Sequence, residues 1–124
     1  MENSRYKILI VDDDPDISMM LKLMLEFKGY TVNTTDRPEE THSILGENTG
    51  TDLVIMDMLL SGVNGTDICT QVKQSDITRH IPVLMISAHP NAKEICLQAG
   101  ADDFISKPFD MQDILSKINS LVKK

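Results

Sequence analysis

The chain has 124 residues, which is enough for one domain with a buried core, and we expect residues 1–124 to form a single domain. Hydrophobic residues make up 41% and charged residues 25%, a balance that excludes a disordered or membrane-embedded chain. The net charge of −7 argues against direct contact with nucleic acid or an anionic membrane, so a protein or a metal ion is the expected partner. Residues 1–7 lack the apolar stretch of a secretion signal, and we therefore expect a cytoplasmic protein.

Three short apolar runs predict buried strands: KILIV within Tyr6–Val11, LVIMDM at Leu53–Met58 and PVLMIS at Pro82–Ser87. Continuous rather than alternating hydrophobicity is typical of strands that are covered on both faces, as in a parallel sheet. Weaker patterns at Tyr30–Thr35 and Asp103–Ser106 predict two further strands, the first of them at an outer position.

Five segments between and after these strands predict helices. The first begins with Asp14 as an N-cap and Pro15 at the first helical position, and Gly29 ends it. The second, Arg37–Gly46, has only a thin apolar face. The other four helices each have a clear apolar face. In chain order, these faces are Ile17, Met20, Leu21, Met24 and Leu25 in the first helix; Ile68, Cys69 and Val72 in the third; Ala92, Ile95, Cys96 and Ala99 in the fourth; and Met111, Ile114, Leu115, Ile118, Leu121 and Val122 in the fifth.

Alternating strands and helices predict an α/β fold with three layers. Right-handed crossovers between parallel strands place helices on both faces of the sheet, which gives a five-stranded parallel sheet between two helical layers. After the central strand, the segment LLSGVNG predicts a loop in which Gly62 and Gly65 allow backbone conformations closed to other residues.

Polar side chains stand where the predicted strands end. They are Asp12 and Asp13, then Asp57, Ser87 and Lys107. In open α/β sheets the functional crevice lies beyond the carboxyl ends of the strands, so these side chains are expected to converge. Three carboxylates at one site repel one another, and a hard cation such as Mg²⁺ relieves the repulsion. The lysine and the hydroxyl add donors suited to a phosphoryl group.

The whole chain resembles the receiver domain of two-component response regulators. Five motifs carry the resemblance in order: VDD with Asp12 and Asp13, LVIMD ending in Asp57, Ser87 followed by Ala88, GADDFISKPF at Gly100–Phe109, and the GxxG spacing of Gly62 and Gly65. The resemblance implies a flavodoxin-like fold in which the five strands take the order 2-1-3-4-5. It also implies a place in phosphorelay signal transduction.

The resemblance further implies roles for the residues at the strand ends. Asp57 would be the phosphoacceptor that attacks a phosphohistidine. Asp12, Asp13, Asp57 and the backbone carbonyl of Leu59 would hold Mg²⁺. Lys107 would pair with Asp57 before the reaction and with a phosphoryl oxygen afterwards.

Two more residues would form the switch that responds to phosphorylation. Ser87 would donate a hydrogen bond to another phosphoryl oxygen, and Phe104 would be the aromatic side chain whose rotamer follows the change. The peptide bond before Pro108 would be cis. The chain departs from the family pattern at Leu60 and Ser61, where relatives usually have Met-Pro, and this departure implies a less rigid loop. It also has Ser87 where threonine is commoner and Phe104 where tyrosine is, and these two variants bear on the strength of the switch.

The function expected from these residues is a signalling switch rather than a turnover enzyme, with autophosphatase activity as a further expectation. A sensor histidine kinase or a phosphotransfer protein would supply the phosphoryl group, and binding to a downstream protein target would change, with phosphorylation-dependent dimerisation as a further outcome. The target would contact the face formed by the fourth helix, fifth strand and fifth helix. The chain between Met1 and the basic Lys123 and Lys124 fits a complete protein, with a receiver excised from a longer regulator or hybrid kinase as the alternative.

Two other classes of protein use a comparable fold or chemistry. A Mg²⁺-dependent phosphohydrolase usually carries its nucleophile after the first strand and needs a cap over the substrate, for which this chain has little room. A flavodoxin-like FMN binder needs a glycine- and hydroxyl-rich phosphate loop where this chain has the acidic Asp12–Asp14.

The remaining cysteines and histidines do not have the spacing of metal ligands. Cys69 and Cys96 are expected to be buried free thiols. His42, His80 and His89 are scattered, although His89, two residues after Ser87, is a candidate to overlook the phosphoryl group and influence its hydrolysis.

Overall fold

The computed structural model describes residues 6–47, 50–60 and 63–122. Its centre is a five-stranded sheet in which every neighbouring pair of strands is parallel. The strands are β2 (Thr31–Thr35), β1 (Lys7–Val11), β3 (Leu53–Asp57), β6 (Val83–Ser87) and β7 (Asp103–Ser106), in that spatial order. Counted along the chain, these five strands have the order 2-1-3-4-5, which confirms the expected topology.

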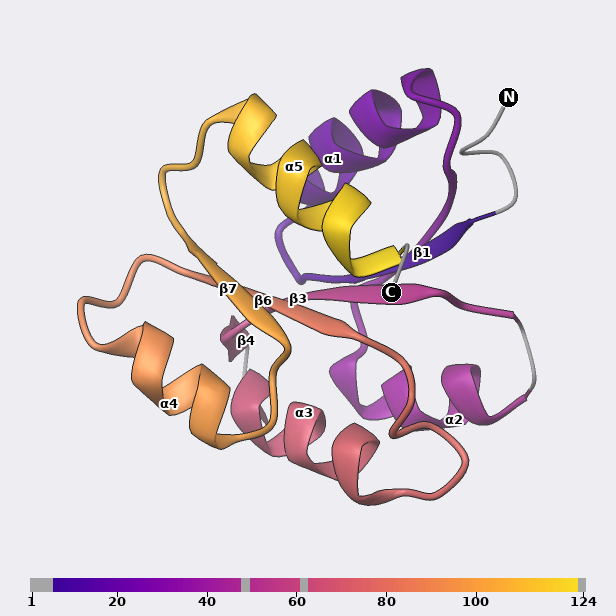
Figure 1. The fold of residues 1–124 in the computed structure, drawn as a ribbon, viewed down its shortest axis with the longest axis vertical. Helices are drawn as coiled ribbons and strands as arrows, with labels where there is room; N and C mark the ends of the chain where they lie inside the picture. Colours follow the sequence, from indigo (N-terminus) through magenta and orange to yellow (C-terminus); the bar gives the residue numbers. More distant parts are fainter. Residues whose placement is uncertain (1–5, 48–49, 61–62, 123–124) are drawn as a thin grey trace.

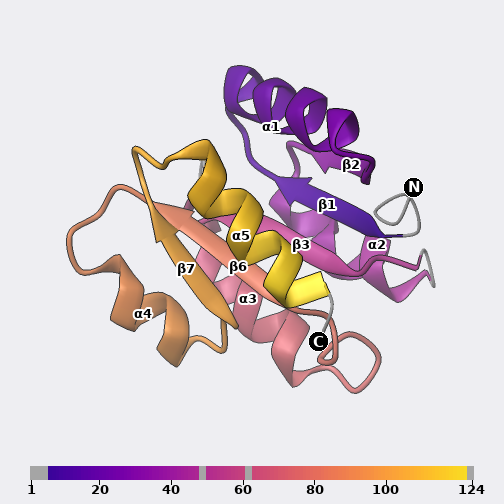
Figure 2. The ribbon, with the colours of Figure 1, turned by 45° about the horizontal axis from the view of Figure 1, so that its top comes forward.

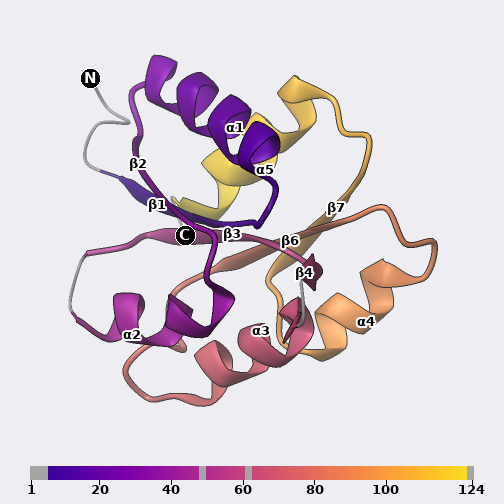
Figure 3. The same cartoon turned by 180° about the vertical axis from the view of Figure 1, so that it is seen from behind.

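Helices cover both faces of the sheet and complete a three-layer sandwich (Figure 1). On one face lie α1 (Pro15–Phe27) and α5 (Met111–Val122). On the other lie α2 (Thr41–Gly46), α3 (Gly65–Gln74) and α4 (Ala92–Gln98), and the same layers are visible in the tilted and reversed views (Figures 2 and 3). The three-layer α/β prediction is therefore confirmed.

The sheet separates two hydrophobic clusters. Alternate residues of each strand point to opposite faces, so Ile8 and Ile10 join the cluster that packs against α1 and α5. Leu9 and Val11 join the cluster beneath α2, α3 and α4, which also contains Cys69 and Cys96. Both cysteines are free thiols, as expected, and burial raises the pKa of Cys69 to about 11. The central strands have apolar side chains on both faces because both faces are covered.

Some details of the predicted helices are wrong. The segment predicted as one helix, Arg37–Gly46, begins with a 3₁₀ turn, η2 (Pro38–Glu40), and becomes α-helical only at Thr41. Met20 and Ile95, assigned to buried faces, are 45% and 39% exposed. Their spacing is helical, but the narrow strip of each helix that contacts the sheet contains Leu21 and Leu25 in α1, and Ala92 and Cys96 in α4.

The loop after β3 contains a small hairpin that the sequence pattern did not predict. Strands β4 (Leu59–Leu60) and β5 (Val63–Asn64) pair antiparallel. The predictions for Ser61 and Gly62 fall outside the described residues. None of the helices in the described part of the chain has the length and hydropathy of a membrane span.

Candidate functional site

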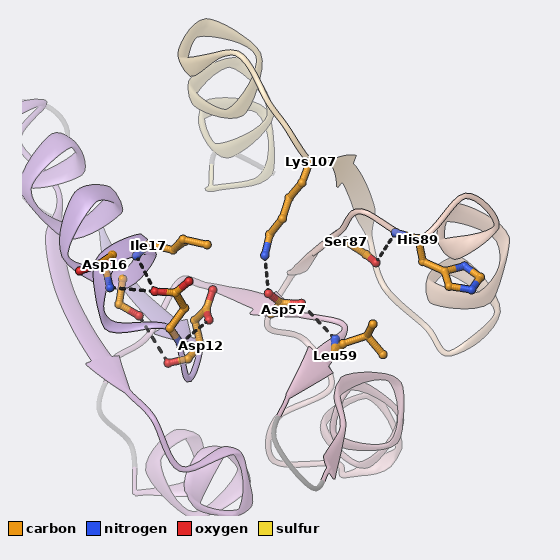
Figure 4. A network of polar contacts seen from close by, with 10 residues as sticks. Asp12, Asp16, Ile17, Asp57, Leu59, Ser87, His89 and Lys107 are labelled. Atoms are coloured by element: carbon orange, nitrogen blue, oxygen red, sulfur yellow. Dashed lines mark hydrogen bonds and ion pairs between the residues drawn. The ribbon is translucent and has the colours of Figure 1, made fainter.

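The carboxyl ends of four strands bring the predicted site residues to one edge of the sheet. Asp12 follows β1, Asp57 ends β3, Ser87 ends β6 and Lys107 follows β7. Because β1 and β6 both pair with β3, the Asp12 and Ser87 segments flank Asp57. Figure 4 shows the arrangement, with the Lys107 side chain reaching towards Asp57.

Asp57 is buried, and both of its carboxylate oxygens accept hydrogen bonds. Its Oδ2 lies 2.6 Å from Nζ of Lys107, and its Oδ1 accepts from the backbone N–H of Leu59 at 3.0 Å (Figure 4). An opposite charge and two donors make a buried carboxylate tolerable in a largely apolar setting. Lys107 precedes Pro108, and the bond between them is cis, as expected. The contact from the Leu59 N–H was not predicted, because any residue at that position supplies the same backbone donor.

Asp12 is the second buried carboxylate of the site, with 4% of its surface exposed. Its Oδ1 accepts from the backbone N–H of Asp14 at 2.8 Å. Burial raises the pKa of Asp12, and the neighbouring negative charge of Asp57 raises it further, while the hydrogen bond from Asp14 opposes the shift. The two carboxylates are thus close enough to repel each other.

The turn that carries Asp12 is held in place by the start of α1. Asp14 is the N-cap, as predicted, and its side chain accepts from the backbone N–H groups of Asp16 and Ile17 at 2.9 and 3.4 Å. Asp13 lies between Asp12 and this cap and is partly exposed. The acidic turn is therefore built from local hydrogen bonds.

The atoms at this end of the strands that could bind a metal ion include the carboxylate oxygens of Asp12 and Asp57. In the described residues, no three carboxylate, imidazole or thiol groups form a ready-made metal cage. Mg²⁺ retains several water ligands and commonly uses one or two protein carboxylates, so it does not need such a cage. Two mutually repelling carboxylates, Asp12 and Asp57, fit a hard divalent cation of this kind.

Gly65 is required by the close approach of the backbone around Asp57. A Cβ atom at position 65 would lie 2.3 Å from the backbone oxygen of Asp57 and 2.9 Å from that of Met58. The Gly65 N–H also donates to the Met58 oxygen at 2.7 Å. Gly65 is not among the glycines with a left-handed φ, so it is the close approach of the backbone oxygens that excludes a side chain at this position.

Ser87 and Phe104 lie on neighbouring strands. Ser87 is 2% exposed, and its Oγ accepts from the backbone N–H of His89 at 3.0 Å. Phe104 is partly buried and packs against the cluster beneath α2, α3 and α4. The His89 imidazole points away from Asp57, so the geometry does not favour the hypothesis that it overlooks a phosphoryl group (Figure 4).

Residues 8–119 match the family model of the response regulator receiver domain. The match covers most of the chain, so the protein belongs to this family, whose members are signalling domains of two-component systems. The five-stranded parallel sheet and the acidic edge with its lysine agree with that membership.

Similar proteins include regulators and isolated receiver domains. The nisin biosynthesis regulatory protein NisR of Lactococcus lactis is 34% identical over 121 residues, which cover 96% of this chain and 51% of NisR. A putative response regulator from Chloroflexus aurantiacus has a crystal structure with a TM-score of 0.89 and 34% identity, covering 96% of this chain and 98% of that one. The chain spans about half the length of the curated relatives it matches.

A second similar structure is the receiver domain of the Pseudomonas aeruginosa sensor histidine kinase PA1611. It has a TM-score of 0.86 and 24% identity, and the alignment covers 96% of this chain and 98% of that one. Its crystal structure has a magnesium ion coordinated in the active-site cleft. At this level of identity the similarity shows a shared fold.

Proposed function

We propose that the protein is a phosphorylation-dependent signalling switch whose phosphoacceptor is Asp57. The observation that carries this proposal is the Asp57–Lys107 pair, in which a buried carboxylate at the end of β3 lies 2.6 Å from an ammonium group supplied by the loop after β7. Membership of the receiver family supports the same role. A sensor histidine kinase or a phosphotransfer protein is the proposed donor.

In the proposed reaction, an Asp57 carboxylate oxygen attacks the phosphorus atom of a phosphohistidine. The new P–O bond forms an acyl phosphate, the P–N bond breaks, and the histidine nitrogen leaves with its electron pair and takes up a proton from solvent. Phosphoryl transfer depends mainly on positioning and on neutralising charge at the transferred oxygens. Lys107 holds Asp57 in place before the reaction and is close enough to donate to a phosphoryl oxygen afterwards.

The residues proposed to hold Mg²⁺ are Asp12, Asp13, Asp57 and the backbone carbonyl of Leu59. A bound Mg²⁺ would neutralise charge on the carboxylates and the incoming phosphoryl oxygens. Burial first, and also the charge of Asp57, raise the pKa of Asp12, and this supports the assignment because a cation bound here would favour the ionised form of the carboxylate.

The response to phosphorylation is proposed to pass through Ser87 and Phe104. A phosphoryl group adds roughly −1.5 to −2 charge and three strong acceptors, so it attracts the Ser87 hydroxyl. The proposed output face is formed by α4, β7 and α5, where a surface hollow is lined by His89, Lys93, Phe104, Asp113 and Lys117, among others. This face would bind a downstream protein or a second copy of the chain.

A second role for the same chemistry is that of a receiver within a longer protein. The chain covers only 51% of NisR, and PA1611 shows a receiver of the same fold in a sensor histidine kinase. In that case the partner of the output face would be another domain of the same polypeptide. Hydrolysis of the aspartyl phosphate by the receiver itself is part of both proposals.

Intact-mass measurement after incubation with acetyl phosphate and Mg²⁺ tests the proposal. We expect one phosphoryl adduct on the wild-type protein and none on Asp57→Asn. Asp76→Asn, which changes a side chain that is 88% exposed, is the matched control and should retain the adduct. An adduct that survives Asp57→Asn, or its absence from the wild type, would contradict the proposal.

A further inference from the structure

The segment between β6 and α4 is held by three hydrogen bonds that all involve His89. The backbone N–H of His89 donates to Ser87 Oγ at 3.0 Å. The His89 Nδ1 accepts from the backbone N–H of Asn91 at 3.2 Å, and the His89 carbonyl accepts from the N–H of Ala92 at 3.2 Å. His89 therefore connects the buried hydroxyl of Ser87 with the first residue of α4.

The imidazole serves as an acceptor within its own loop. In Figure 4 the ring lies on the α4 side of the loop, with the backbone nitrogen of His89 linked to Ser87. Asn91 is the N-cap residue of α4, and its own side chain makes no capping hydrogen bond. The contact from His89 Nδ1 to the Asn91 N–H is thus a side-chain contact that holds the turn into α4.

We propose that His89 is a positioning residue that stabilises the loop conformation of the unphosphorylated protein. A phosphoryl oxygen on Asp57 would accept a hydrogen bond from the Ser87 O–H, and the Ser87 side chain would turn towards Asp57 to reach it, which carries Oγ away from the His89 N–H. When Ser87 follows the phosphoryl group, the His89 backbone loses its partner, the Nδ1–Asn91 contact opens, and the start of α4 is released. This inference rests on the proposed function, and it adds the residue that links the Ser87 hydroxyl to α4.

The energetic effect follows from the competition between two loop conformations. A contact made in only one conformation shifts the equilibrium by its own free energy. One hydrogen bond corresponds to roughly a three- to tenfold shift in an equilibrium constant. Removing the His89 acceptor should therefore make the phosphorylated conformation easier to reach by roughly that factor.

Three variants test the inference. His89→Ala removes the Nδ1 acceptor. His89→Asn restores an acceptor, because an asparagine Oδ1 accepts from the N–H two residues later in an Asx-turn. His80→Ala is the matched control, because His80 is also an exposed histidine but lies at the opposite end of the sheet, before β6.

The first measurement is amide hydrogen exchange of Asn91 in the unphosphorylated protein. We expect roughly three- to tenfold faster exchange in His89→Ala, and wild-type exchange in His89→Asn and His80→Ala. The second is the affinity for beryllium trifluoride with Mg²⁺, a mimic of the phosphoryl group. We expect roughly three- to tenfold tighter binding to His89→Ala, with the other two variants like the wild type.

Unchanged exchange and affinity in His89→Ala would overturn the inference, and so would a His89→Asn variant that behaves like His89→Ala. The two proposals fail in different ways. A wild-type protein that neither takes up a phosphoryl group nor binds beryllium trifluoride contradicts the proposed function. Normal phosphorylation of all variants, with no difference in Asn91 exchange or in affinity, contradicts only the role of His89.

Discussion

Two lysine–aspartate ion pairs lie at opposite ends of the strands of the parallel sheet. At the amino end of β6, Lys73 Nζ lies 2.8 Å from Asp102 Oδ2 and also donates to the backbone oxygens of Arg79 and Ile81 at 3.1 and 2.9 Å. The same Asp102 oxygen accepts from the backbone N–H of Val83 at 2.8 Å. This pair joins α3, the segment before β6 and the segment before β7.

At the carboxyl ends of the strands, the Lys107–Asp57 pair is similarly short, at 2.6 Å, but its lysine makes fewer polar contacts than Lys73 does. Within residues 6–47, 50–60 and 63–122, Lys107 Nζ has one hydrogen-bond partner, Asp57 Oδ2, whereas Lys73 Nζ donates two hydrogen bonds and also forms an ion pair with Asp102. An ammonium group has three N–H donors, so Lys107 retains donors that a phosphoryl oxygen could use.

The difference between the two pairs concerns what each lysine can still bind. Lys73 uses its donors on fixed backbone oxygens and on Asp102, which stabilises the folded chain. Lys107 and Asp57 lie next to a second buried carboxylate, Asp12, whose raised pKa reflects burial and the charge of Asp57. The donors of Lys73 are used within the fold, whereas Lys107 retains donors beside two buried carboxylates.

Lys107→Ala should produce the largest effect. It removes the ammonium group that pairs with Asp57 and that we propose neutralises phosphoryl charge, so we expect phosphorylation by acetyl phosphate to slow by roughly a hundredfold, in line with the loss of one preorganised donor. Intact-mass time courses provide the rate. A rate within about threefold of the wild type would show that Lys107 does not assist the reaction.

Lys73→Met should affect stability rather than phosphorylation. The substitution leaves the Arg79 and Ile81 oxygens without their donor and Asp102 without its cation, so we expect a loss of about 2 kcal/mol in the free energy of unfolding. Urea unfolding measures this loss. The rate of phosphorylation of the folded protein should stay at the wild-type value, and a large decrease would mean that the two ends of the strands are coupled.

Asp12→Asn should give the smallest effect, and the size of this effect on the free energy of unfolding depends on pH. Burial, followed by the charge of Asp57, raises the pKa of Asp12, so the folded state binds this proton more tightly than the unfolded state. The resulting loss of folding stability is absent at pH values below the pKa of Asp12 in the unfolded state. It is complete at pH values above the raised pKa of Asp12 in the folded state. In EDTA, the Asn variant should therefore be more stable than the wild type at neutral pH, and the difference should disappear as the pH falls through this window.

Urea unfolding at neutral and acidic pH checks the effect of Asp12→Asn. A variant that is less stable than the wild type at neutral pH without metal would contradict the reasoning. Added Mg²⁺ should stabilise the wild-type protein more than the variant, because a cation that binds the folded state shifts its stability by mass action.

The elements with the strongest hydrophobic patterns were predictable. The apolar runs of β1, β3 and β6 and the capped start of α1 appear where the sequence indicates. The separation of η2 from α2 and the β4–β5 hairpin were not predictable, because short elements have too few residues to form a periodic pattern. Met20 and Ile95 show that helical spacing alone does not set the width of a buried face.

The polar residues of the candidate site were predictable in part. Asp57 and Lys107 could be assigned to strand ends, and the structure joins them across 50 positions of the chain. The Lys73–Asp102 pair was not predicted, since its members stand in ordinary helix and loop segments and meet only after the chain folds. The acceptor role of His89 was also missed, because a histidine in a loop has no sequence signal for a contact with a backbone N–H.

The sequence by itself determined the α/β class, the receiver resemblance and the residue types at the strand ends, because buried strands and helix caps depend on local patterns. Only the tertiary structure decided which charges are paired and which groups remain available. It placed Lys107 on Asp57, Lys73 on Asp102, and the Ser87 hydroxyl next to the His89 N–H. Hydrogen bonds and ion pairs act over a few ångströms, so their partners are defined by three-dimensional proximity rather than by position in the sequence.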